Sequence, residues 1–567
     1  MRRQVQVIWF KRDLRVHDHA PLVEACRRGS PLALYLYEPE LLQADEMDDR
    51  HLAFINDSLA ELHAALAELG VPLVVLHQEA TAALATVDRE LGIAGLWSHE
   101  ETGTRRTWDR DRRVAAWCGE QGIPWHEVPQ NGVVRRLRDR DGWSRRWQGR
   151  MNEPEVPLVD QVVDPLSPAA LRRLAGVSLV GLPGGDLPGC SLPGCGLPGG
   201  DLPGCGLPGS AELGVRAVRG LRWAQACTVG EPATGRDRGG MTGGLAGIDD
   251  RDGLQRGGSR VGLDTLATFL DRRGVGYRAD MSSPVEGWQG CSRLSPHLAW
   301  GTVSLRRVYQ QTRARTLELR ERRAAGEPID SRWAGSLASF EGRLRWHCHF
   351  IQKLEDEPDI EFHNMNRAMD GLREDAFDAS RFAAWAAGET GYPMVDACMR
   401  ALLHTGWLNF RMRAMLMSFA SYHLWLHWRP TAIHLARLFT DFEPGIHYAQ
   451  AQMQAGVTGI NTVRIYSPAK QVRDQDPQGR FIRRWVPELA GVPDAALAEP
   501  HRMTSLEQQL AGCVIGVHYP APIVDHETAW REARARVYAA RRAPDARAES
   551  ERVYERHGSR RKPRARS

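Results

Sequence analysis

The sequence lacks long apolar runs and contains few cysteines, and both absences exclude classes of protein. No stretch approaches the roughly 18 consecutive apolar residues that a membrane-spanning helix requires, and the apolar run at 5–10 is too short for the core of a signal peptide. Ten cysteines are spread over 567 residues, and none belongs to a Cys-x-x-Cys pair. This usage is typical of the reducing cytoplasm. We therefore expect a cytoplasmic protein without membrane contact.

The net charge is small as well, and it is unevenly distributed. The formal charge is +4, yet residues 531–567 alone carry thirteen Lys or Arg against five Asp or Glu. The rest of the chain is slightly acidic and can bind a polyanion only where its basic residues cluster. Residues 541–567 are interpreted as a basic tail, which is either a solvated, disordered end or an additional contact to nucleic acid.

At 567 residues the chain is too long for one hydrophobic core, so two domains with appendages are expected. Residues 1–160 alternate apolar with amphipathic segments, which predicts an α/β domain with a doubly wound parallel sheet covered on both faces. Gly70, Gly92 and Gly122 each follow a helical segment and turn the chain into the next strand. The strands are expected at 5–10, 32–37, 72–76, 93–97 and 123–128.

Residues 161–260 differ in composition from both flanks and are interpreted as a connector between domains. The unit Leu-Pro-Gly-x-x occurs six times over 182–210. Proline at every fifth position excludes a helix and glycine weakens a strand, so this connector is expected to be disordered. Its cysteines lack histidine partners, and no metal site is expected there. From 261 to 540 the periodicity is helical, which predicts one all-α domain.

Two motifs in the helical region carry the most information. In 390–413, TGYPMVDACMRALLHTGWLNFRMR, a proline and a glycine bound one helix, and the next helix carries Arg413. The second motif, DFEPGIHYAQAQMQ at 441–454, begins with Asp441 and Glu443, which could pair with that arginine. Together these motifs resemble the flavin-cradling core of the photolyase/cryptochrome family. The opening IWFKRDLRVHDHAPL also resembles the N-terminal domain of that family.

The resemblance implies an all-α FAD-binding domain and an antenna chromophore, of folate or deazaflavin type, in the N-terminal domain. The family's diphosphate turn, Thr-Ser-x-Leu-Ser, corresponds to residues 291–295, with cysteine in the first place. Ser295 is expected to cap a helix whose first residue is Pro296, and the free N–H groups there attract phosphate. The residues expected to bind the cofactor are Tyr277, Ser292, Arg293, Leu294, Ser295, Arg343, His347, Arg413, Asp441, Glu443 and His447.

The resemblance also assigns roles beside the flavin ring. Arg413 and Asp441 match a buried pair in which the guanidinium stabilises an anionic reduced flavin and the carboxylate fixes the guanidinium. Glu443 falls against the polar ring edge, and His447 falls opposite flavin N5, where photolyases commonly carry asparagine. A histidine there could donate to N5 or be protonated, which predicts a semiquinone yield that depends on pH between about 5 and 8. Alternatively, His447 only satisfies a hydrogen bond in the core.

On the substrate side, Trp346 matches the tryptophan that stacks on a flipped lesion. Four positions depart from the family: Arg343 replaces a glutamate, Asn409–Phe410 replaces a His-Asn or His-His pair, and Met453 replaces an aromatic residue. These departures favour a cryptochrome-like role. Contacts to DNA phosphates are expected from Arg411, Arg464 and Lys470.

Electron supply in the family runs through a chain of tryptophans. Trp428 matches the middle member of that chain, whereas Ala451 occupies the position nearest the flavin, and Trp385 lies near an alternative route. The residues expected to take part in catalysis are Trp346, His447, Trp428 and Trp385.

The sequence thus predicts an FAD-dependent enzyme that uses blue light to repair pyrimidine dimers in DNA. Light would excite reduced FAD, an electron would pass to the lesion and return after the lesion splits. The main alternative is a cryptochrome-like photoreceptor with the same cofactor, no repair activity and a signalling partner. A flavin-binding protein with neither activity is a third reading. For the repair enzyme the expected partner is UV-damaged DNA, and the protein is expected to be a monomer.

Overall fold

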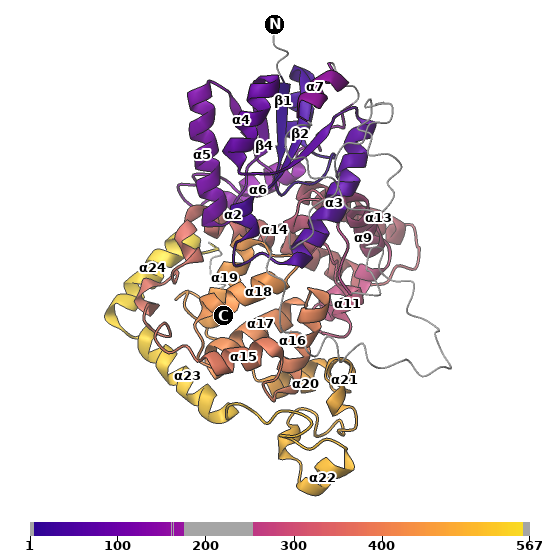
Figure 1. The fold of residues 1–567 in the computed structure, drawn as a ribbon. Coiled ribbons are helices and arrows are strands. Elements are labelled where there is room, and N and C mark those ends of the chain that lie inside the picture. Colours follow the sequence, from indigo (N-terminus) through magenta and orange to yellow (C-terminus); the bar gives the residue numbers. More distant parts are fainter. Residues whose placement is uncertain (1–4, 160–161, 163, 175–252, 560–567) are drawn as a thin grey trace.

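A five-stranded parallel sheet forms the centre of the N-terminal domain (Figure 1). The computed structural model describes residues 5–159, 162, 164–174 and 253–559. The strands are β1 (Val5–Phe10), β2 (Ser30–Tyr37), β3 (Leu73–His77), β4 (Ile93–His99) and β5 (Trp125–Val128). Their order is β3-β2-β1-β4-β5, and every neighbouring pair is parallel. The predicted doubly wound sheet is confirmed.

Helices cover both faces of this sheet. They are α1 (Ala20–Arg28), α2 (Pro39–Leu42), α3 (Asp49–Glu68), α4 (Ala80–Leu91), α5 (Arg105–Gln121) and α7 (Pro168–Leu174). Helix α6 (Trp143–Asn152) follows β5 in the chain but packs on the helical domain. Ile8 and Phe10 of β1 pack with α1 and α3, whereas Val5, Val7 and Trp9 pack with α4 and α5. All six residues of β1 are buried, as expected for a central strand covered on both faces.

The three glycines predicted to end helices do so. Gly70, Gly92 and Gly122 have φ angles of 73°, 75° and 67°, in the left-handed region where a side chain is strained. Each is followed within three residues by β3, β4 or β5. The chain therefore reverses from helix to strand at the positions that the sequence indicated.

Asp13 ties together the loops at the carboxyl ends of β1 and β4. Its Oδ2 is hydrogen-bonded to His19 Nε2 at 3.0 Å and to His99 Nδ1 at 2.7 Å, and its Oδ1 accepts the Lys11 N–H at 2.7 Å. The three acidic and imidazole side chains lie close enough together to hold a metal ion. Because these hydrogen bonds already satisfy the carboxylate, we interpret the three side chains as a buried structural link between the two loops.

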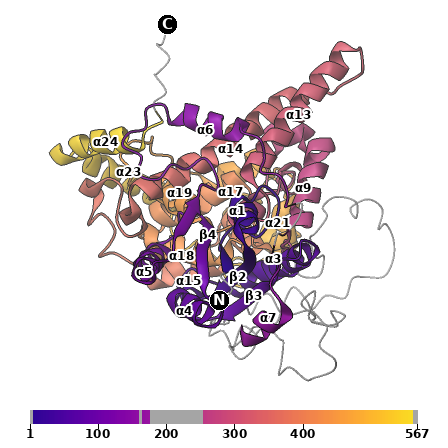
Figure 2. The same ribbon diagram turned by 90° about the horizontal axis from the view of Figure 1, so that it is seen from above.

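Helices form the second domain, which lies below the sheet in Figure 1. The helices are α9 (Ser259–Asp271), α10 (Tyr277–Asp280), α11 (Gly287–Gly290), α12 (Ser295–Ala299), α13 (Leu305–Ala324), α14 (Arg332–Asp356), α15 (Ala379–Ala387), α16 (Pro393–Thr405), α17 (Phe410–Ser418), α18 (Trp428–Leu438), α19 (Pro444–Ala455), α20 (Pro468–Gln475), α21 (Arg480–Trp485), α22 (Ser505–Leu510), α23 (His526–Arg541) and α24 (Pro544–His557). Short 3-10 turns and one π-helical turn, η4 (Phe419–His423), connect some of them. Seen from above, α13 projects away from the body of the molecule (Figure 2).

Within residues 253–559 the structure contains no strand apart from isolated bridges, so the expected all-α character of this part is confirmed. One large cluster of buried side chains joins α16 to α17, α18, α19 and α21. Across the described ranges, we find no helix with the length and apolar character needed to cross a bilayer.

The C-terminal helix α24 corrects the expectation for 541–567. Residues expected to form a solvated tail are helical instead, and Val553 is completely buried against α14 residues. His557 is also buried, and its Nε2 lies 2.7 Å from a carboxylate oxygen of Glu357. The apolar positions of this charged segment share one face, which packs on the body. Part of the predicted connector is ordered, which corrects the expectation for its two ends: α7 packs Leu171 and Leu174 on the sheet, and α9 begins at Ser259. Residues 175–252 lie outside the described residues, so their disorder stays a prediction.

Candidate functional site

A large cavity lies inside the helical domain. It contains about 1460 Å³ of space free of protein atoms, part of which is open to solvent. Its walls come from α14, α17, α19 and the segment that precedes α12. Nine residues predicted to bind the cofactor line it: Tyr277, Ser292, Ser295, Arg343, His347, Arg413, Asp441, Glu443 and His447.

Arg413 and Asp441 form the ion pair that the motif predicted. Two parallel hydrogen bonds join them, from Nη1 to Oδ1 at 2.9 Å and from Nη2 to Oδ2 at 2.7 Å, and Arg413 Nε donates to the Leu408 carbonyl at 2.7 Å. Burial would raise the pKa of Asp441, but the Arg413 guanidinium and its hydrogen bonds outweigh burial and hold that pKa below its ordinary value. The cavity wall thus carries a guanidinium fixed in place, which attracts negative charge on a ligand.

Arg293 is a second guanidinium, and it is buried without a hydrogen-bond partner. It lies between two indole rings, 4.1 Å from the centroid of Trp288 and 3.8 Å from that of Trp407. None of its three side-chain nitrogens meets an acceptor among the described residues, and burial lowers its pKa to about 9. Arg293 does not line the cavity, but its neighbours Ser292 and Trp407 do. Since an unpaired buried cation is costly, the positive charge of Arg293 behind that wall fits an anionic ligand inside the cavity, such as a diphosphate.

The turn at 291–295 differs in detail from the expectation. The N-cap of α12 is Leu294, so Ser295 is the first helical residue and Pro296 the second. The Ser295 hydroxyl instead donates a hydrogen bond to the Asp441 carboxylate. A buried carboxylate is a strong acceptor because it carries a charge. Leu294 is buried away from the cavity, which corrects its assignment to the cofactor site.

The mouth of the cavity carries exposed aromatic rings. Arg343 and His347 are one turn apart on α14 and line the cavity, and Trp346 beside them is 46% exposed. The Arg343 guanidinium lies 5.8 Å from the ring centroid of Trp346 and 5.0 Å from that of Phe410. Phe410, at the start of α17, lines the cavity and is 45% exposed. Two rings and a cation at one opening can stack on a planar ligand.

His447 lines the cavity, but its ring already has a partner. Its Nε2 lies 2.7 Å from the carbonyl oxygen of Ala432, and because a carbonyl only accepts, Nε2 carries the proton and Nδ1 of the neutral ring keeps its lone pair. Burial lowers the pKa of His447 to about 4. The expected pH dependence between about 5 and 8 is therefore corrected. In that range the ring stays neutral, and Nδ1 can accept a hydrogen bond rather than donate one.

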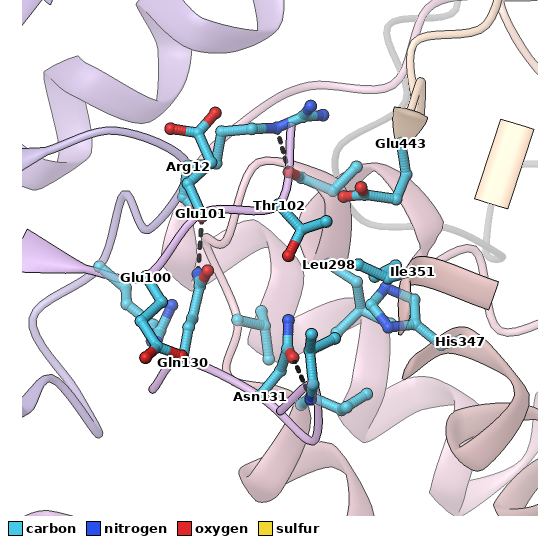
Figure 3. A pocket seen from close by; sticks show the side chains of 15 residues that line it. Arg12, Glu100, Glu101, Thr102, Gln130, Asn131, Leu298, His347, Ile351 and Glu443 are labelled. Atoms are coloured by element: carbon cyan, nitrogen blue, oxygen red, sulfur yellow. Dashed lines mark hydrogen bonds between the residues drawn. The ribbon is translucent and has the colours of Figure 1, made fainter. Parts of the chain in front are cut away.

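A second cavity lies between the two domains and shares a wall with the first (Figure 3). Glu443 and His347 line both cavities. Arg12, from the loop after β1, donates from Nε to the Ala299 carbonyl at 2.9 Å and also bonds the Phe442 carbonyl. Burial raises the pKa of Glu443 to about 7, although Arg12 opposes this shift. The α/β domain thus positions the loop that carries both acidic residues of the motif.

The two tryptophans expected to carry electrons do not contribute to the wall of the cavity. Trp428 and Trp385 are completely buried, and neither lines the cavity. Trp428 Nε1 donates to Asn364 Oδ1 at 2.7 Å, and the ring of Trp385 packs on that of His434 at 5.6 Å. Ala451 does line the cavity, so a methyl group stands where the resemblance places the first tryptophan. The roles of both tryptophans in electron transfer stay predictions.

The basic residues proposed for DNA contacts lie outside the cavity. Arg411 is partly buried and its Nη2 donates to Ser282 Oγ at 3.2 Å. Arg464 and Lys470 are exposed, and Lys470 pairs with Asp474 at 3.0 Å. An exposed pair of this kind contributes only about 0.3–0.5 kcal/mol, so Lys470 can exchange its partner for a phosphate. Contact between these side chains and DNA stays a prediction.

Asp396 lies within the 390–413 motif, and its structural role becomes visible only in the fold. Its buried carboxylate accepts hydrogen bonds from the Thr390 N–H at 2.8 Å, the Thr390 hydroxyl at 2.6 Å, the Gly391 N–H at 3.0 Å and the Tyr519 hydroxyl at 2.5 Å. It therefore anchors the loop before α16 to a segment far along the chain. The available signal was an acidic residue on the otherwise apolar face of that helix.

Comparisons with known proteins agree with this geometry. Residues 6–139 match the family model described as DNA photolyase, and residues 340–539 match the model described as the FAD binding domain of DNA photolyase. A deoxyribodipyrimidine photo-lyase of Streptomyces griseus is 29% identical over 546 residues, which cover 95% of this chain and 99% of the relative. A cryptochrome DASH of Gloeobacter violaceus is 27% identical over 535 residues, with 93% and 94% covered. These names include both repair enzymes and cryptochromes.

The fold also matches a solved structure along nearly its whole length. The crystal structure of a bacterial class III photolyase from Agrobacterium tumefaciens superposes with a TM-score of 0.72 and covers 96% of this chain and 99% of its own. The sequences are 22% identical. At this identity the likeness concerns the fold.

Proposed function

The chain belongs to the photolyase/cryptochrome family, and on this basis we propose that it is a deoxyribodipyrimidine photo-lyase. In this proposal it binds FAD in the helical domain and uses blue light to repair pyrimidine dimers in UV-damaged DNA. One observation carries it: a single cavity joins the Arg413–Asp441 pair inside the domain to the exposed ring of Phe410, and Trp346 lies just outside its wall, next to Arg343. The same space can therefore hold a flavin and admit a base.

The side chains of the cavity fit FAD. Bound FAD would supply light absorption and electron transfer. Arg413 at the wall and the unpaired Arg293 behind it favour a ligand that carries negative charge, as the diphosphate and a reduced flavin do. His447 offers a hydrogen-bond acceptor to a protonated ring nitrogen. Arg12 bonds the Phe442 carbonyl and so holds the loop that carries Glu443. The Glu443 carboxyl adds a second polar group to the same wall.

A lesion flipped out of the duplex would enter at the mouth. Damaged pairs unstack at low cost, and Trp346 and Phe410 offer faces on which the exposed bases can stack. Arg343 between these rings supplies N–H donors for the carbonyl oxygens of pyrimidines. Arg411, Arg464 and Lys470 would contact backbone phosphates around the opening.

The direct test is illumination of reduced, FAD-loaded protein with an oligonucleotide that contains one thymine dimer. The expected result is recovery of intact thymines in blue light and none in the dark. A second arm uses a (6-4) photoproduct, because the cavity does not distinguish the two lesions. If neither lesion is repaired while FAD is present and reduced, the enzyme proposal is wrong.

A cryptochrome-like blue-light receptor with a signalling partner is the second candidate. The observation that favours it is the position of Arg343, whose guanidinium already contacts both Trp346 and Phe410 at the place where a base would stack. In that case the FAD-loaded protein responds to light but repairs neither lesion. Under either proposal we expect a monomeric, cytoplasmic protein.

Replacing Trp346 with alanine is expected to weaken binding of dimer-containing DNA without loss of FAD. Stacking on an aromatic ring contributes roughly 1–3 kcal/mol per base, which corresponds to about 5- to 150-fold in Kd. FAD content should not change because Trp346 does not line the cavity. Fluorescence anisotropy of labelled oligonucleotides measures the change. Trp530→Ala is the matched control, because Trp530 is also exposed but lies on α23 beside Arg534; equal losses for both variants would contradict the assignment.

Replacing His447 with asparagine is expected to shift the ratio of oxidised to reduced FAD reached under constant blue light. Asparagine can turn an N–H₂ donor toward the ring where His447 offers only an acceptor, a change in hydrogen bonding of about 1 kcal/mol, or roughly fivefold. The shift should be the same at every pH from 5 to 8, because the pKa of His447 is about 4 and the ring is already neutral there. Absorption spectra at four pH values provide the measurement. A transition within this range in the wild type alone would show that the ring titrates there.

We further propose that the antenna chromophore of folate or deazaflavin type occupies a third cavity, beyond the carboxyl ends of β1 and β2. This cavity contains about 870 Å³ of atom-free space, and its walls include Tyr35, Tyr37 and Glu38. Arg110 lies 4.8 Å from the ring of Trp9 there, which provides a fixed cation beside aromatic surface. Ligands of parallel sheets bind at this end of the strands. Extraction of the purified protein, followed by absorption spectroscopy, would identify a second chromophore.

A further inference from the structure

Tyr448 lies between the wall of the FAD cavity and Trp428. On one side its ring centroid is 5.6 Å from that of His447 and 6.2 Å from that of Phe442, and both of these side chains line the cavity. On the other side the ring of Trp428 lies edge-on at 6.3 Å. Tyr448 and Trp428 are completely buried. One layer of side chains therefore separates the phenol from the cavity.

The hydroxyl of Tyr448 donates to a carboxylate from the other domain. The acceptor is Glu46 Oε1 at 2.6 Å, in the loop after α2, and Glu46 is 7% exposed. Burial, followed by the neighbouring Glu46, raises the pKa of Tyr448 well above its ordinary value. The reduced phenol of Tyr448 is therefore protonated at neutral pH, and it gives up its proton only when it is oxidised.

Tyr448 and Glu46 can act together, with the phenol as electron donor and the carboxylate as acceptor of its proton. Removing an electron from a buried phenol leaves a cation, which surroundings of low polarity destabilise. Transfer of the proton along an existing short hydrogen bond to a carboxylate removes that charge. Helix α19 contains no tryptophan and one tyrosine, and Ala451 at the cavity wall cannot be oxidised. Tyr448 is therefore the residue of this helix best placed to donate an electron.

We propose that Tyr448 is a redox-active residue that gives an electron to light-excited, oxidised FAD while Glu46 takes up its phenolic proton. The inference rests on the proposed flavin function. In this step the O–H bond of Tyr448 breaks and an O–H bond forms on Glu46. Tyr448 is oxidised by one electron and FAD is reduced by one. A thiol reductant in solution then returns one electron to Tyr448, and the proton moves back from Glu46.

Two variants separate this role from a purely structural link between the domains. Tyr448→Phe keeps the ring and removes the O–H group. Glu46→Gln keeps an oxygen that accepts the hydrogen bond, so the domains stay linked, but an amide does not take up the proton. Unchanged thermal unfolding of Glu46→Gln would show that the link survives.

The experiment is electron paramagnetic resonance of FAD-loaded, oxidised protein frozen under blue light, with ordinary and with ring-deuterated tyrosine. The wild type should give a tyrosyl signal that narrows on deuteration. We expect no such signal from Tyr448→Phe and at least a tenfold weaker one from Glu46→Gln. Tyr519 is the matched control, since it is also buried and donates to a carboxylate, Asp396, at 2.5 Å, but does not adjoin the cavity. Tyr519→Phe should leave the signal unchanged.

FAD content, measured for each protein, separates failure of the relay from failure of the proposed function. Wild-type protein that binds no FAD would overturn the flavin function itself. FAD-loaded wild type without a tyrosyl signal, or an undiminished signal in Tyr448→Phe, would overturn the relay alone. An undiminished signal in Glu46→Gln would show that Glu46 is not the proton acceptor.

Discussion

Arg413→Ala is expected to purify with less than a tenth of the FAD that the wild type retains. The substitution leaves the Asp441 carboxylate buried with the Ser295 hydroxyl but without its charged partner, which costs roughly 3–5 kcal/mol. It also removes the fixed cation from the cavity wall. A hydrogen bond from such a cation to an anionic ligand contributes about 1.5–3 kcal/mol, so its loss is expected to weaken the Kd for FAD by roughly 10- to 150-fold. Flavin absorbance per protein after gel filtration, and titration of the apoprotein with FAD, measure the effect.

The pH dependence of this result follows from the direction of the pKa shift. Since the pKa of Asp441 is lowered in the folded protein, the pair stabilises the fold fully above the ordinary carboxyl value of 3.8 and loses this contribution only as the pH falls below it. The effect of Arg413→Ala should therefore be constant from pH 6 to 8. Arg473→Ala is the control, because it breaks an exposed pair with Glu499 at 2.8 Å and should change little. Normal FAD content in Arg413→Ala would mean that the ion pair does not support the cofactor.

Asp396→Ala is expected to lower the free energy of unfolding by at least about 3 kcal/mol. The change leaves four buried donors without an acceptor, namely the Thr390 N–H and hydroxyl, the Gly391 N–H and the Tyr519 hydroxyl. Each buried donor left unpaired costs roughly 1–3 kcal/mol, although these costs are not strictly additive. Urea unfolding followed by circular dichroism gives the free energy, which should fall through the midpoint with little change in slope.

Two further substitutions test the reason for this loss. Asp396→Asn keeps one oxygen acceptor but turns an N–H₂ group toward the remaining donors, so an intermediate loss is expected. Asp474→Ala removes an exposed carboxylate that pairs with Lys470 on α20 and should change stability by less than about 0.5 kcal/mol. If Asp396→Ala and Asp474→Ala unfold at the same urea concentration, the buried network does not hold the loop before α16.

The accuracy of the sequence-based expectations follows how local their physical causes are. The five strands and the three helix-ending glycines could be predicted because each depends on a few consecutive residues. An apolar run indicates a buried strand, and a glycine after a helical segment permits the positive φ that ends the helix. The expectation for 541–567 was wrong for α24 because the charged surface of that helix hides the face that Val553 contributes to the core. Composition describes a segment as a whole, whereas packing depends on one of its faces.

The site shows the same division. Arg413 and Asp441 could be paired in advance because the motifs that contain them resemble those of the photolyase/cryptochrome family, and the resemblance implies this pair. Ser295 was assigned as a helix cap because its neighbours suit one, but in the fold Asp441 offers its hydroxyl a charged acceptor. His447 was expected to donate or to titrate, and the carbonyl of Ala432 on the adjacent helix decides its tautomer. Each of these outcomes depends on an atom that the local pattern does not contain.

By itself the sequence determined the five strands of the parallel sheet and the helical character of the region that follows, since periodicity and helix ends act over short stretches of chain, whereas the pairing of Arg413 with Asp441 was expected only from the family resemblance. Only the tertiary structure decided that Arg293 lies unpaired between two indole rings and that Tyr448 donates to Glu46, 402 residues away. Burial removes water as the alternative partner for these groups. The partner that each group then finds, or lacks, is set by how the two domains pack, and no local pattern encodes that packing.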